Sequence, residues 1–229
     1  MIRTQTVDGI CTVTLDRPAR RNALTPAALA DLRDAVAATD APVVYIHGAG
    51  EAFCAGADLD VVADLDDDNV AAFVHAGQRT ASALAEADAI TVAGIDGPAR
   101  GGGVELALGC DLRVATPEAT FAESGVSLGL FGAWGGTARL PRIVGLGEAM
   151  DLALTGEVID ADAALRMGLV SRVVEEPKAV AETIAAHESA TLRAIKARLR
   201  DTDTQAAQEE REAEAFARLL ETAALDDRA

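Results

Sequence analysis

Short apolar runs that end near a glycine alternate along this chain with longer stretches of helical periodicity. The apolar runs include PVVYIHG and AITVAGIDG, and helical stretches lie before and between them. Continuous apolar runs are typical of strands buried on both faces, and their alternation with helices favours one core over separate domains. The pattern appears once more in GGGVELALGC followed by DLRVAT and ATFAES. The fold class that we expect is therefore α/β, built from repeated ββα or βα units.

The first residues of the chain predict an antiparallel start. The stretches IRTQTV and ICTVTLDR have strand character and flank Asp8-Gly9, a dipeptide favoured in tight hairpin turns. Thr25-Pro26 is then expected to begin a helix, because proline is tolerated at the first helical position, where its missing N–H costs least. The apolar residues of this helix recur at helical spacing, and they are Ala28, Leu29, Leu32 and Val36.

The last third of the chain has a different pattern. From about Thr137 onward the spacing of apolar residues predicts helices, and LVSRVV is the one strand expected there. We therefore divide the chain into a core over residues 1–175 and a C-terminal helical region over residues 176–229. The apolar residues of that region either cover the core or pack against a neighbouring subunit, and they include Leu192, Ile195, Leu199, Phe216, Leu219 and Leu220.

Charge and cysteine content exclude several classes of function. A formal net charge of −17 argues against nucleic acid or an anionic membrane surface as a partner, since both require positive fields. No stretch approaches the roughly 20 unbroken apolar residues of a membrane span, and the start lacks the features of a secretory signal, so we expect a soluble, cytoplasmic protein. Cys11, Cys54 and Cys110 are widely spaced without neighbouring histidines, which favours buried, reduced thiols over disulfides or a zinc site.

Lysine is almost absent from the sequence. Lys178 and Lys196 are the only lysines, and the other cations are arginines. An acidic surface with so little lysine fits a cytoplasm of very high salt, and a genome rich in G and C would deplete lysine as well. The sequence leaves both explanations open.

Two glycine-containing loops each follow an apolar strand and are the candidates for a ligand site. The first is AFCAGAD, and the second begins at Gly101-Gly102-Gly103. Three successive glycines before ELALGC place unhindered N–H groups at a helix N-terminus, where unpaired donors and the helix dipole favour a developing negative charge. Glu105 lies on the same helix face as Gly102, and its side chain leans back toward those amides. Taken alone, a triple glycine is better explained by tight packing of a helix against a strand.

The two loops together carry a more specific signal. AFCAGADL and GGGVELALGCDLRVA, in this order, resemble the crotonase family of enoyl-CoA hydratases and isomerases, and so do RPARRNAL, GGTARLPRIVG and ALTGEVIDADAALRMGLVSRVV. The resemblance implies a crotonase-like spiral of ββα units over residues 1–175 with a helical C-terminal region, commonly assembled as a homotrimer or homohexamer. It also implies an acyl-CoA thioester as substrate, with no separate cofactor. Many members end in a helix that reaches a CoA site, whereas this chain ends in LDDRA, about where that helix would begin.

The resemblance also assigns roles to residues. It implies that the N–H groups of Ala57 and Gly102 hold the thioester oxygen, with Glu105 as the acid or base. It implies that Arg20 or Arg21 lies near the CoA phosphates, which suits the fork geometry of arginine, although a solvated surface explains these arginines equally well. The other residues that it places around the substrate are Asn22, Ala23, Ala55, Asp58, Leu59, Gly101 and Trp134. Two of these have simpler interpretations, since Asp58 is also suited to cap a helix and Trp134 to pack beneath a loop.

The second glutamate of the family's hydratases is missing from its usual place. That residue lies in a stretch like FGQPE, and the corresponding stretch here, FAESG, has Gly125 in its position. Hydration needs a base that delivers water to Cβ and an acid that protonates Cα, while the thioester oxygen takes up negative charge. Glu123, two residues earlier, is a candidate for the second acid, and an ordinary polar residue in the alternative interpretation.

Three functions compete on these observations. We expect an enoyl-CoA hydratase in which Ala57 and Gly102 donate to the thioester oxygen and Glu105 is the acid or base. An enoyl-CoA isomerase, which needs one group to move a proton between two carbons, is the nearest alternative. A non-catalytic acyl-CoA binder is the third. The three histidines have no partner pattern and are assigned no role.

Overall fold

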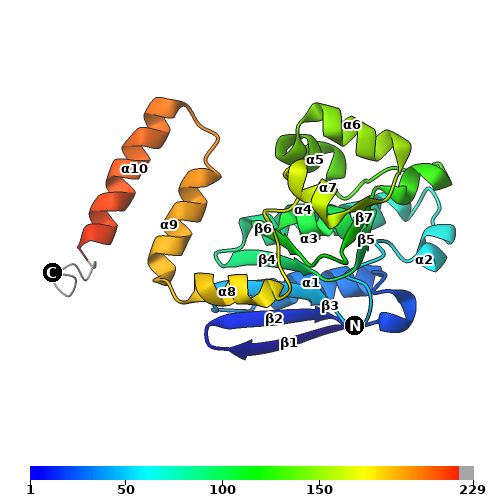
Figure 1. The fold of residues 1–229 in the computed structure, drawn as a ribbon, viewed down its shortest axis with the longest axis horizontal. Coiled ribbons are helices and arrows are strands. Elements are labelled where there is room, and N and C mark those ends of the chain that lie inside the picture. The colour runs from blue at the N-terminus through cyan, green and yellow to red at the C-terminus, as the bar shows by residue number, and fades with distance from the viewer. Residues whose placement is uncertain (222–229) are drawn as a thin grey trace.

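Two sheets form the centre of the protein, and a pair of helices stands apart on one side (Figure 1). The computed structural model describes residues 1–221. In spatial order, the six strands of the main sheet are β1 (Ile2–Val7), β2 (Ile10–Leu15), β3 (Val43–Gly48), β4 (Ile90–Ile95), β6 (Leu112–Ala115) and β9 (Arg172–Val173). The smaller sheet has the order β5 (Pro98–Arg100), β7 (Thr120–Ala122) and β8 (Ile159–Asp160).

The expected hairpin begins the main sheet. Strands β1 and β2 are antiparallel, and Val7 pairs with Ile10 at the turn. Asp8 and Gly9 both have positive φ, 49° and 76°, as the two central residues of the tightest hairpin turns require. From β2 onward each neighbouring pair of strands in this sheet is parallel, so that the ends of successive strands meet at one edge.

Helices connect the parallel strands and cover the sheets. They are α1 (Pro26–Ala37), α2 (Leu59–Ala63), α3 (Val70–Glu86), α4 (Gly102–Gly109), α5 (Gly136–Val144), α6 (Leu146–Thr155), α7 (Ala161–Arg166), α8 (Pro177–Ala185), α9 (Ser189–Leu199) and α10 (Gln205–Leu220). Two 3₁₀ turns, η1 (Pro18–Arg20) and η2 (Ser124–Leu128), lie in the connecting loops. Helix α1 begins as predicted, with the Thr25 hydroxyl accepting a hydrogen bond from the Ala28 amide and the four predicted apolar residues buried.

The core lies on both faces of the main sheet. All six residues of β4 are buried, which explains why its sequence is one continuous apolar run. The larger apolar cluster packs α1, α3 and α4 against one face, and a smaller cluster packs α8 against the other. Cys11, Cys54 and Cys110 are buried and free, as predicted, and burial raises the pKa of the Cys54 and Cys110 thiols to about 12.

Strand β8 in the last third of the chain was not predicted. Strand β8 has only two residues, and Ile159 and Asp160 pair with Phe121 and Thr120 of β7. The expectation of a single strand after Thr137 was therefore wrong, since β8 accompanies β9 there. A two-residue strand carries no periodicity, so its pairing is decided by the neighbour that the fold places beside it.

The apolar residues of α9 and α10 fall into two groups, one that covers the core and one that is exposed. Leu192 is partly buried against the smaller apolar cluster, so the start of α9 covers the core. Ile195, Leu199, Phe216 and Leu220 are exposed, and the two helices project from the body of the protein (Figure 1). The proposed boundary at residue 175 falls between β9 and α8, and the division into domains stays a prediction. The terminal LDDRA lies outside the described residues.

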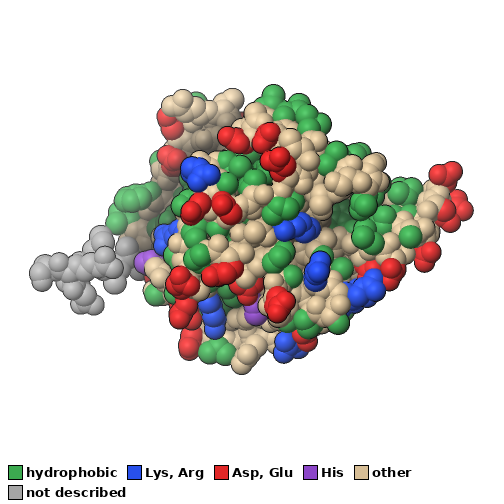
Figure 2. All heavy atoms as spheres, turned by 45° about the vertical axis from the view of Figure 1, so that its right-hand side comes forward, with side chains coloured by type: hydrophobic (Ala, Val, Ile, Leu, Met, Phe, Trp, Pro, Cys, Tyr) green, Lys and Arg blue, Asp and Glu red, His purple; other side chains and the backbone are tan. Residues whose placement is uncertain are grey.

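The described surface is acidic with apolar patches. Figure 2 shows Asp and Glu side chains spread over one face, with fewer Lys and Arg among them and apolar side chains gathered in several groups. Among the helices of residues 1–221, none combines the length and the apolar character that crossing a membrane requires.

Candidate active site

The two glycine-containing loops meet at the edge of the sheets. The Cys54 amide donates to the Pro98 carbonyl at 3.2 Å, and the Arg100 amide donates to the Cys54 carbonyl at 2.9 Å. Gly56 has a φ of +85°, and a Cβ placed on it would lie 2.8 Å from the Gly102 nitrogen. Glycine is required here because the backbones approach too closely for a side chain. The fold therefore brings together the two loops that the sequence singled out.

Two backbone amides at this junction, those of Ala57 and Gly102, have no acceptor in the part of the chain that the structure describes. Leu24 pairs with both neighbours of Ala57, as its amide donates to Gly56 and its carbonyl accepts from Asp58. In such a parallel bridge the N–H of the central residue, Ala57, points to the opposite side. Gly102 is the first residue of α4, where helical amides lack an intrahelical acceptor. Within residues 1–221 neither of these two amides has a hydrogen-bond acceptor.

Both amides border a cavity of about 190 Å³. Ala55, Gly101 and Trp134, which the sequence also proposed, line it with Leu59. Most of the remaining wall is apolar, and it consists of Val62, Leu65, Val70, Phe73, Val74, Leu128, Leu130, Phe131 and Ala133. Two carboxylates, Glu105 and Glu123, complete it beside a serine and two glycines. A small apolar cavity with few convergent polar groups is typical of a ligand site.

Glu105 is buried and fixed by the backbone. Its Oε1 atom accepts hydrogen bonds from the Trp134 and Gly136 amides, both at 2.7 Å. Those amides lie at the N-terminus of α5, where the helix dipole also favours a negative charge. Burial raises the pKa of Glu105, and the two amide donors and the Arg139 guanidinium oppose that rise. The carboxylate is thus held in one orientation, and its donors offset part of the effect of burial on its pKa.

Glu123 is buried without such support. Its side chain is 7% exposed, and within residues 1–221 its Oε1 atom has no hydrogen-bond partner. Burial, together with repulsion from Glu105, raises the pKa of Glu123 to about 8. A carboxyl with this pKa holds a proton at neutral pH and can donate it.

The two carboxylates face the same small volume. A Cβ placed on Gly132 would lie 3.0 Å from Glu105 Oε1 and 3.1 Å from Glu123 Oε2. Neighbouring acids whose environments push their pKa values apart are suited to separate roles as base and acid. Glu123 therefore supplies a second carboxyl next to Glu105, although it comes from a position two residues before Gly125.

Position 125 itself is closely packed. A Cβ on Gly125 would lie 3.2 Å from the Leu130 carbonyl oxygen, so the glycine allows the loop before α5 to fold back over η2. Strand β7 ends at Ala122, and Phe121, Ala122 and Glu123 are all buried, so burial does not alternate along this segment. The inward direction of Glu123 is therefore set by the tertiary structure and not by a pattern in the sequence.

Trp134 has both of the roles that the sequence left open. Its ring packs edge-on against Phe73, with 5.7 Å between the ring centroids. A Cβ on Gly102 would lie 2.5 Å from the same ring, so the indole covers the start of α4. Trp134 thus packs against Phe73 and lines the cavity, and its backbone amide donates a hydrogen bond to Glu105.

The basic segment before α1 is organised around Asp58. Asp58 caps α2 by accepting from the Asp60 amide at 3.0 Å, as the simpler interpretation predicted. It is 2% exposed and pairs with Arg17 and Arg20, and Arg20 also pairs with Asp60. The Arg17 hydrogen bond holds the pKa of the Asp58 carboxyl below its usual range. Arg17 is a residue that the sequence analysis missed.

Two of the residues expected to bind CoA make structural contacts within the protein. Asn22 is buried, accepts from the Arg17 amide and donates to the carbonyls of residues 49, 52 and 53. Asp58 pairs with two arginines, and a contact of either residue with CoA stays a prediction. Ala23 is buried outside the cavity wall. Arg21, with φ +50°, is exposed and has no ion-pair partner within residues 1–221.

Known proteins resemble this chain over most of its length. Residues 5–226 match the family described as enoyl-CoA hydratase/isomerase. A crotonyl-CoA hydratase of Syntrophomonas wolfei is 39% identical over 173 residues, covering 73% of this chain and 66% of that protein. A short-chain-enoyl-CoA hydratase of Clostridium acetobutylicum is 36% identical over 171 residues, covering 72% of this chain and 66% of that protein. The matches thus span just under two thirds of the length of these relatives.

The fold has close counterparts among solved structures. The structure of an enoyl-CoA hydratase from Bacillus anthracis superposes with a TM-score of 0.89 at 31% identity, covering 94% of this chain and 89% of that chain. An enoyl-CoA hydratase from Thermoplasma volcanium superposes with a TM-score of 0.90 at 29% identity, covering 96% and 92%. The fold class predicted from the sequence is confirmed.

Proposed function

Because this chain belongs to the enoyl-CoA hydratase/isomerase family, we propose that it adds water across the α,β double bond of a 2-enoyl-CoA thioester. The observation that carries this proposal is the pair of buried carboxylates that face one cavity beside two free backbone amides. Hydration requires three elements: stabilisation of charge on the thioester oxygen, a base for water and an acid for Cα.

The free amides of Ala57 and Gly102 supply the first element. In this proposal both N–H groups donate to the thioester oxygen as it becomes an enolate oxygen. The helix dipole of α4 adds to the stabilisation, because its N-terminus is at Gly102. Donors that are already fixed by the fold need no reorganisation during the reaction, which is why such sites are effective.

Glu105 is the proposed base. Its Oε1 atom is occupied by two amide donors, which leaves Oε2 to accept a proton from water. The two donors also fix the direction in which that water is delivered. We assign to Glu105 the removal of one proton from water as the water oxygen bonds to Cβ.

Glu123 is the proposed acid and takes the place of the carboxyl missing at position 125. With a pKa raised to about 8, it holds its proton at neutral pH and gives it to Cα. After one turnover Glu105 carries a proton and Glu123 has lost one. Because both carboxylates face the same volume, transfer of that proton from Glu105 to Glu123 restores the starting state. The sum is the addition of one water, so the reaction needs no separate cofactor.

The two carboxyls also separate this function from its alternatives. An isomerase needs only one group to carry a proton between carbons, and a passive binder needs none. A buried acid kept protonated beside a fixed carboxylate has a use in hydration that neither alternative explains.

Binding of the CoA nucleotide is proposed to involve Arg21, whose guanidinium has no ion-pair partner within the described chain, with Arg20 held nearby by Asp58 and Asp60.

The assembly is proposed to be a homotrimer or homohexamer. Four apolar side chains of α9 and α10 are exposed, and so are Leu146, Met150 and Leu154 on α6. Exposed apolar faces of this kind mark interfaces in oligomeric proteins. Light scattering coupled to gel filtration would measure the mass of the assembly, and a monomer would contradict this part of the proposal. The three free thiols are consistent with the proposed cytoplasmic location.

The central experiment follows the ultraviolet absorbance of a conjugated short 2-enoyl-CoA at low and at high salt. Rapid loss of absorbance with formation of 3-hydroxyacyl-CoA supports the hydratase. Formation of a 3-enoyl-CoA instead would identify an isomerase, and binding of the thioester without conversion in either salt would identify a passive binder.

A further inference from the structure

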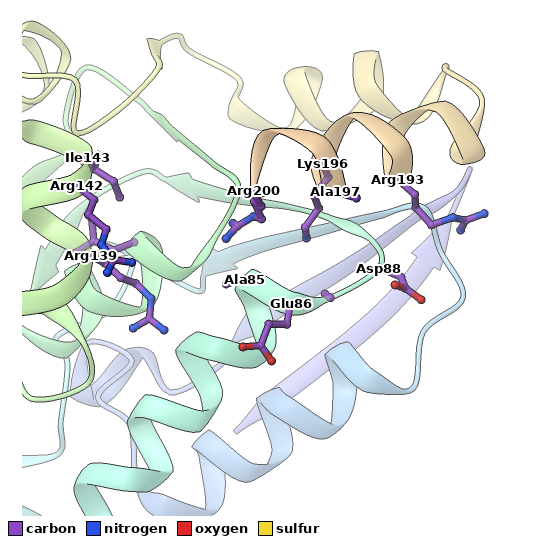
Figure 3. Close-up of a pocket in the computed structure, with 12 residues that line it drawn as sticks. Ala85, Glu86, Asp88, Arg139, Arg142, Ile143, Arg193, Lys196, Ala197 and Arg200 are labelled. Atoms are coloured by element: carbon purple, nitrogen blue, oxygen red, sulfur yellow. The ribbon is translucent and has the colours of Figure 1, made fainter. Parts of the chain in front are cut away.

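A cleft between the core and α9 gathers a quarter of the cations of this acidic protein. Its volume is about 640 Å³. Five of the twenty lysines and arginines line it, and they are Arg139, Arg142, Arg193, Lys196 and Arg200. Figure 3 shows Arg139 and Arg142 on α5, Arg193 and Lys196 on α9 and Arg200 directly after α9, with Glu86 and Asp88 on a third side. The cleft shares no lining residue with the cavity that holds Glu105 and Glu123.

Two of the five cations form ion pairs with the same carboxylate, that of Asp111. Asp111 Oδ2 pairs with Lys196 at 2.8 Å, and Asp111 Oδ1 pairs with Arg200 at 2.7 Å. Asp111 also accepts from the Thr91 amide and hydroxyl, so its position is fixed. The single negative charge of Asp111 therefore balances only one of the two positive charges of Lys196 and Arg200.

The other three cations form no ion pair with any residue of the described range 1–221. Arg139 donates to the Trp134 carbonyl and the Ser82 hydroxyl, which are both uncharged acceptors. Arg142 and Arg193 are exposed and have no hydrogen-bond or ion-pair partner within residues 1–221. Glu86 and Asp88 lie at the cleft without forming an ion pair with any described residue. Even with both of these acids and Asp111 counted, positive charge remains in excess here, against a net charge of −17 for the chain.

The walls between the cations are apolar. They include Ala85, Ala87, Leu108, Ile143 and Ala197. A cleft of this size, with small apolar walls and several arginine forks, suits an organic anion better than a monatomic ion. Phosphate groups bring two negative charges to one point and match the planar guanidinium with two oxygens.

We propose that the cleft between α5 and α9 binds a phosphate-bearing small molecule. The site is separate from the proposed CoA nucleotide site, because Arg20 and Arg21 lie in and next to η1 and not on the helices of the cleft. Its ligand would contact the fixed Arg139 and recruit Arg142 and Arg193, which are free to move toward it. The proposal does not depend on hydratase activity.

Isothermal titration with inorganic pyrophosphate and, separately, with ATP tests the site. Both titrations are made at constant ionic strength, at low and at high potassium chloride. The test variant is Arg142→Gln with Arg193→Gln, which removes two exposed arginines that make no ion pair with any described residue. The matched control is Arg79→Gln with Arg166→Gln, two exposed arginines on α3 and α7 that likewise lack ion-pair partners among the described residues and lie outside the cleft.

We expect saturable binding to the wild type and the control, and roughly tenfold or greater weakening in the test variant, because charged hydrogen bonds are lost. If pyrophosphate binds as tightly as ATP, the cleft recognises the phosphates alone. If ATP binds more tightly, the apolar walls of the cleft contribute to binding as well. Absence of saturable binding at both salts would overturn the proposal. Equal weakening in the control pair would do the same. So would dissociation of an oligomer in the test variant alone, which would show that the cleft holds an acidic surface of a second copy.

Discussion

The carboxyl groups of Glu105 and Glu123 line the same cavity but differ in the hydrogen bonds that they accept from the backbone. Glu105 has two amide donors on one oxygen, and Glu123 has a buried oxygen with no described partner. The first belongs to α4 and is held by α5, whereas the second follows a three-residue strand. Burial raises the pKa of both carboxyls, but the two amide donors and Arg139 oppose that rise at Glu105, whereas no described donor opposes it at Glu123.

The difference shows that a missing catalytic residue in a sequence is not always a missing group in a structure. Position 125 carries glycine, yet a carboxyl is present beside Glu105. What matters for the chemistry is the volume into which a side chain points. Each prediction below tests whether the two carboxyls are as different as their surroundings indicate.

The largest effect is expected for Glu105→Gln. The amide oxygen of glutamine can still accept from Trp134 and Gly136, so the loop should keep its shape while the base is lost. We expect kcat to fall by roughly 10² to 10⁴-fold, as is typical for removal of a general base, with thioester binding nearly unchanged. Absorbance assays and titration with an unreactive acyl-CoA measure the two quantities. Glu118→Gln, an exposed glutamate with no ion pair among described residues, is the control. Retention of full turnover would remove Glu105 from the mechanism.

Glu123→Gln should reduce turnover by about 10²-fold and change its pH dependence. In the wild type, activity needs ionised Glu105 and protonated Glu123, so the rate should decline as pH rises through the Glu123 pKa of about 8. The variant should lose that alkaline decline. A pH–rate profile from pH 5 to 10, measured for both proteins, makes the comparison. An unchanged alkaline limb in the variant would mean that another group causes it.

Stability should respond to pH through Glu123 in a defined direction. Its folded pKa is raised to about 8 from the ordinary value of 4.5, so between these values the folded state holds a proton that the unfolded state has released. The free energy of unfolding of the wild type must therefore fall as pH rises through this window. Glu123→Gln lacks this loss and should be more stable than the wild type at pH 9 by ~2 kcal/mol or more, since one pKa unit corresponds to about 1.4 kcal/mol. Denaturant unfolding at pH 5 and pH 9 measures it. A difference that is the same at both pH values would contradict the raised pKa.

Gly132→Ala should have the smallest effect. Its added methyl would lie 2.9 Å from the Glu105 carboxyl carbon and 3.1 Å from Glu123 Oε2, beside both carboxyls. We expect about a tenfold loss of kcat, because contacts this short shift the Glu105 carboxylate from its two amide donors, whereas the backbone stays unstrained since Gly132 does not have a positive φ. Gly147→Ala, where a Cβ would meet no atom within 4 Å, is the matched control. Equal activity of both variants would show that the two carboxyls do not share this volume.

Much of the fold could be read from local patterns. The Asp8-Gly9 hairpin, the Thr25 cap with its buried helix face and the apolar run of β4 each follow from short-range preferences of the chain. Such features are decided by neighbours in sequence. The two-residue β8 could not be predicted, because only its contact with β7 makes it a strand.

The candidate site likewise combines features that the sequence determines with features that only the tertiary structure determines. The sequence by itself determined the two glycine-containing loops, since only glycine permits the approach of Gly56 to Gly102, and it determined that Glu105 lies one helical turn beyond that approach. Tertiary structure alone decided that Asn22 and Asp58 hold the protein together, that Glu123 enters the cavity without a partner and that α5 and α9 form a basic cleft. The physical reason is that burial and charge depend on which distant segments surround a side chain, and the order of residues along the chain does not specify those surroundings.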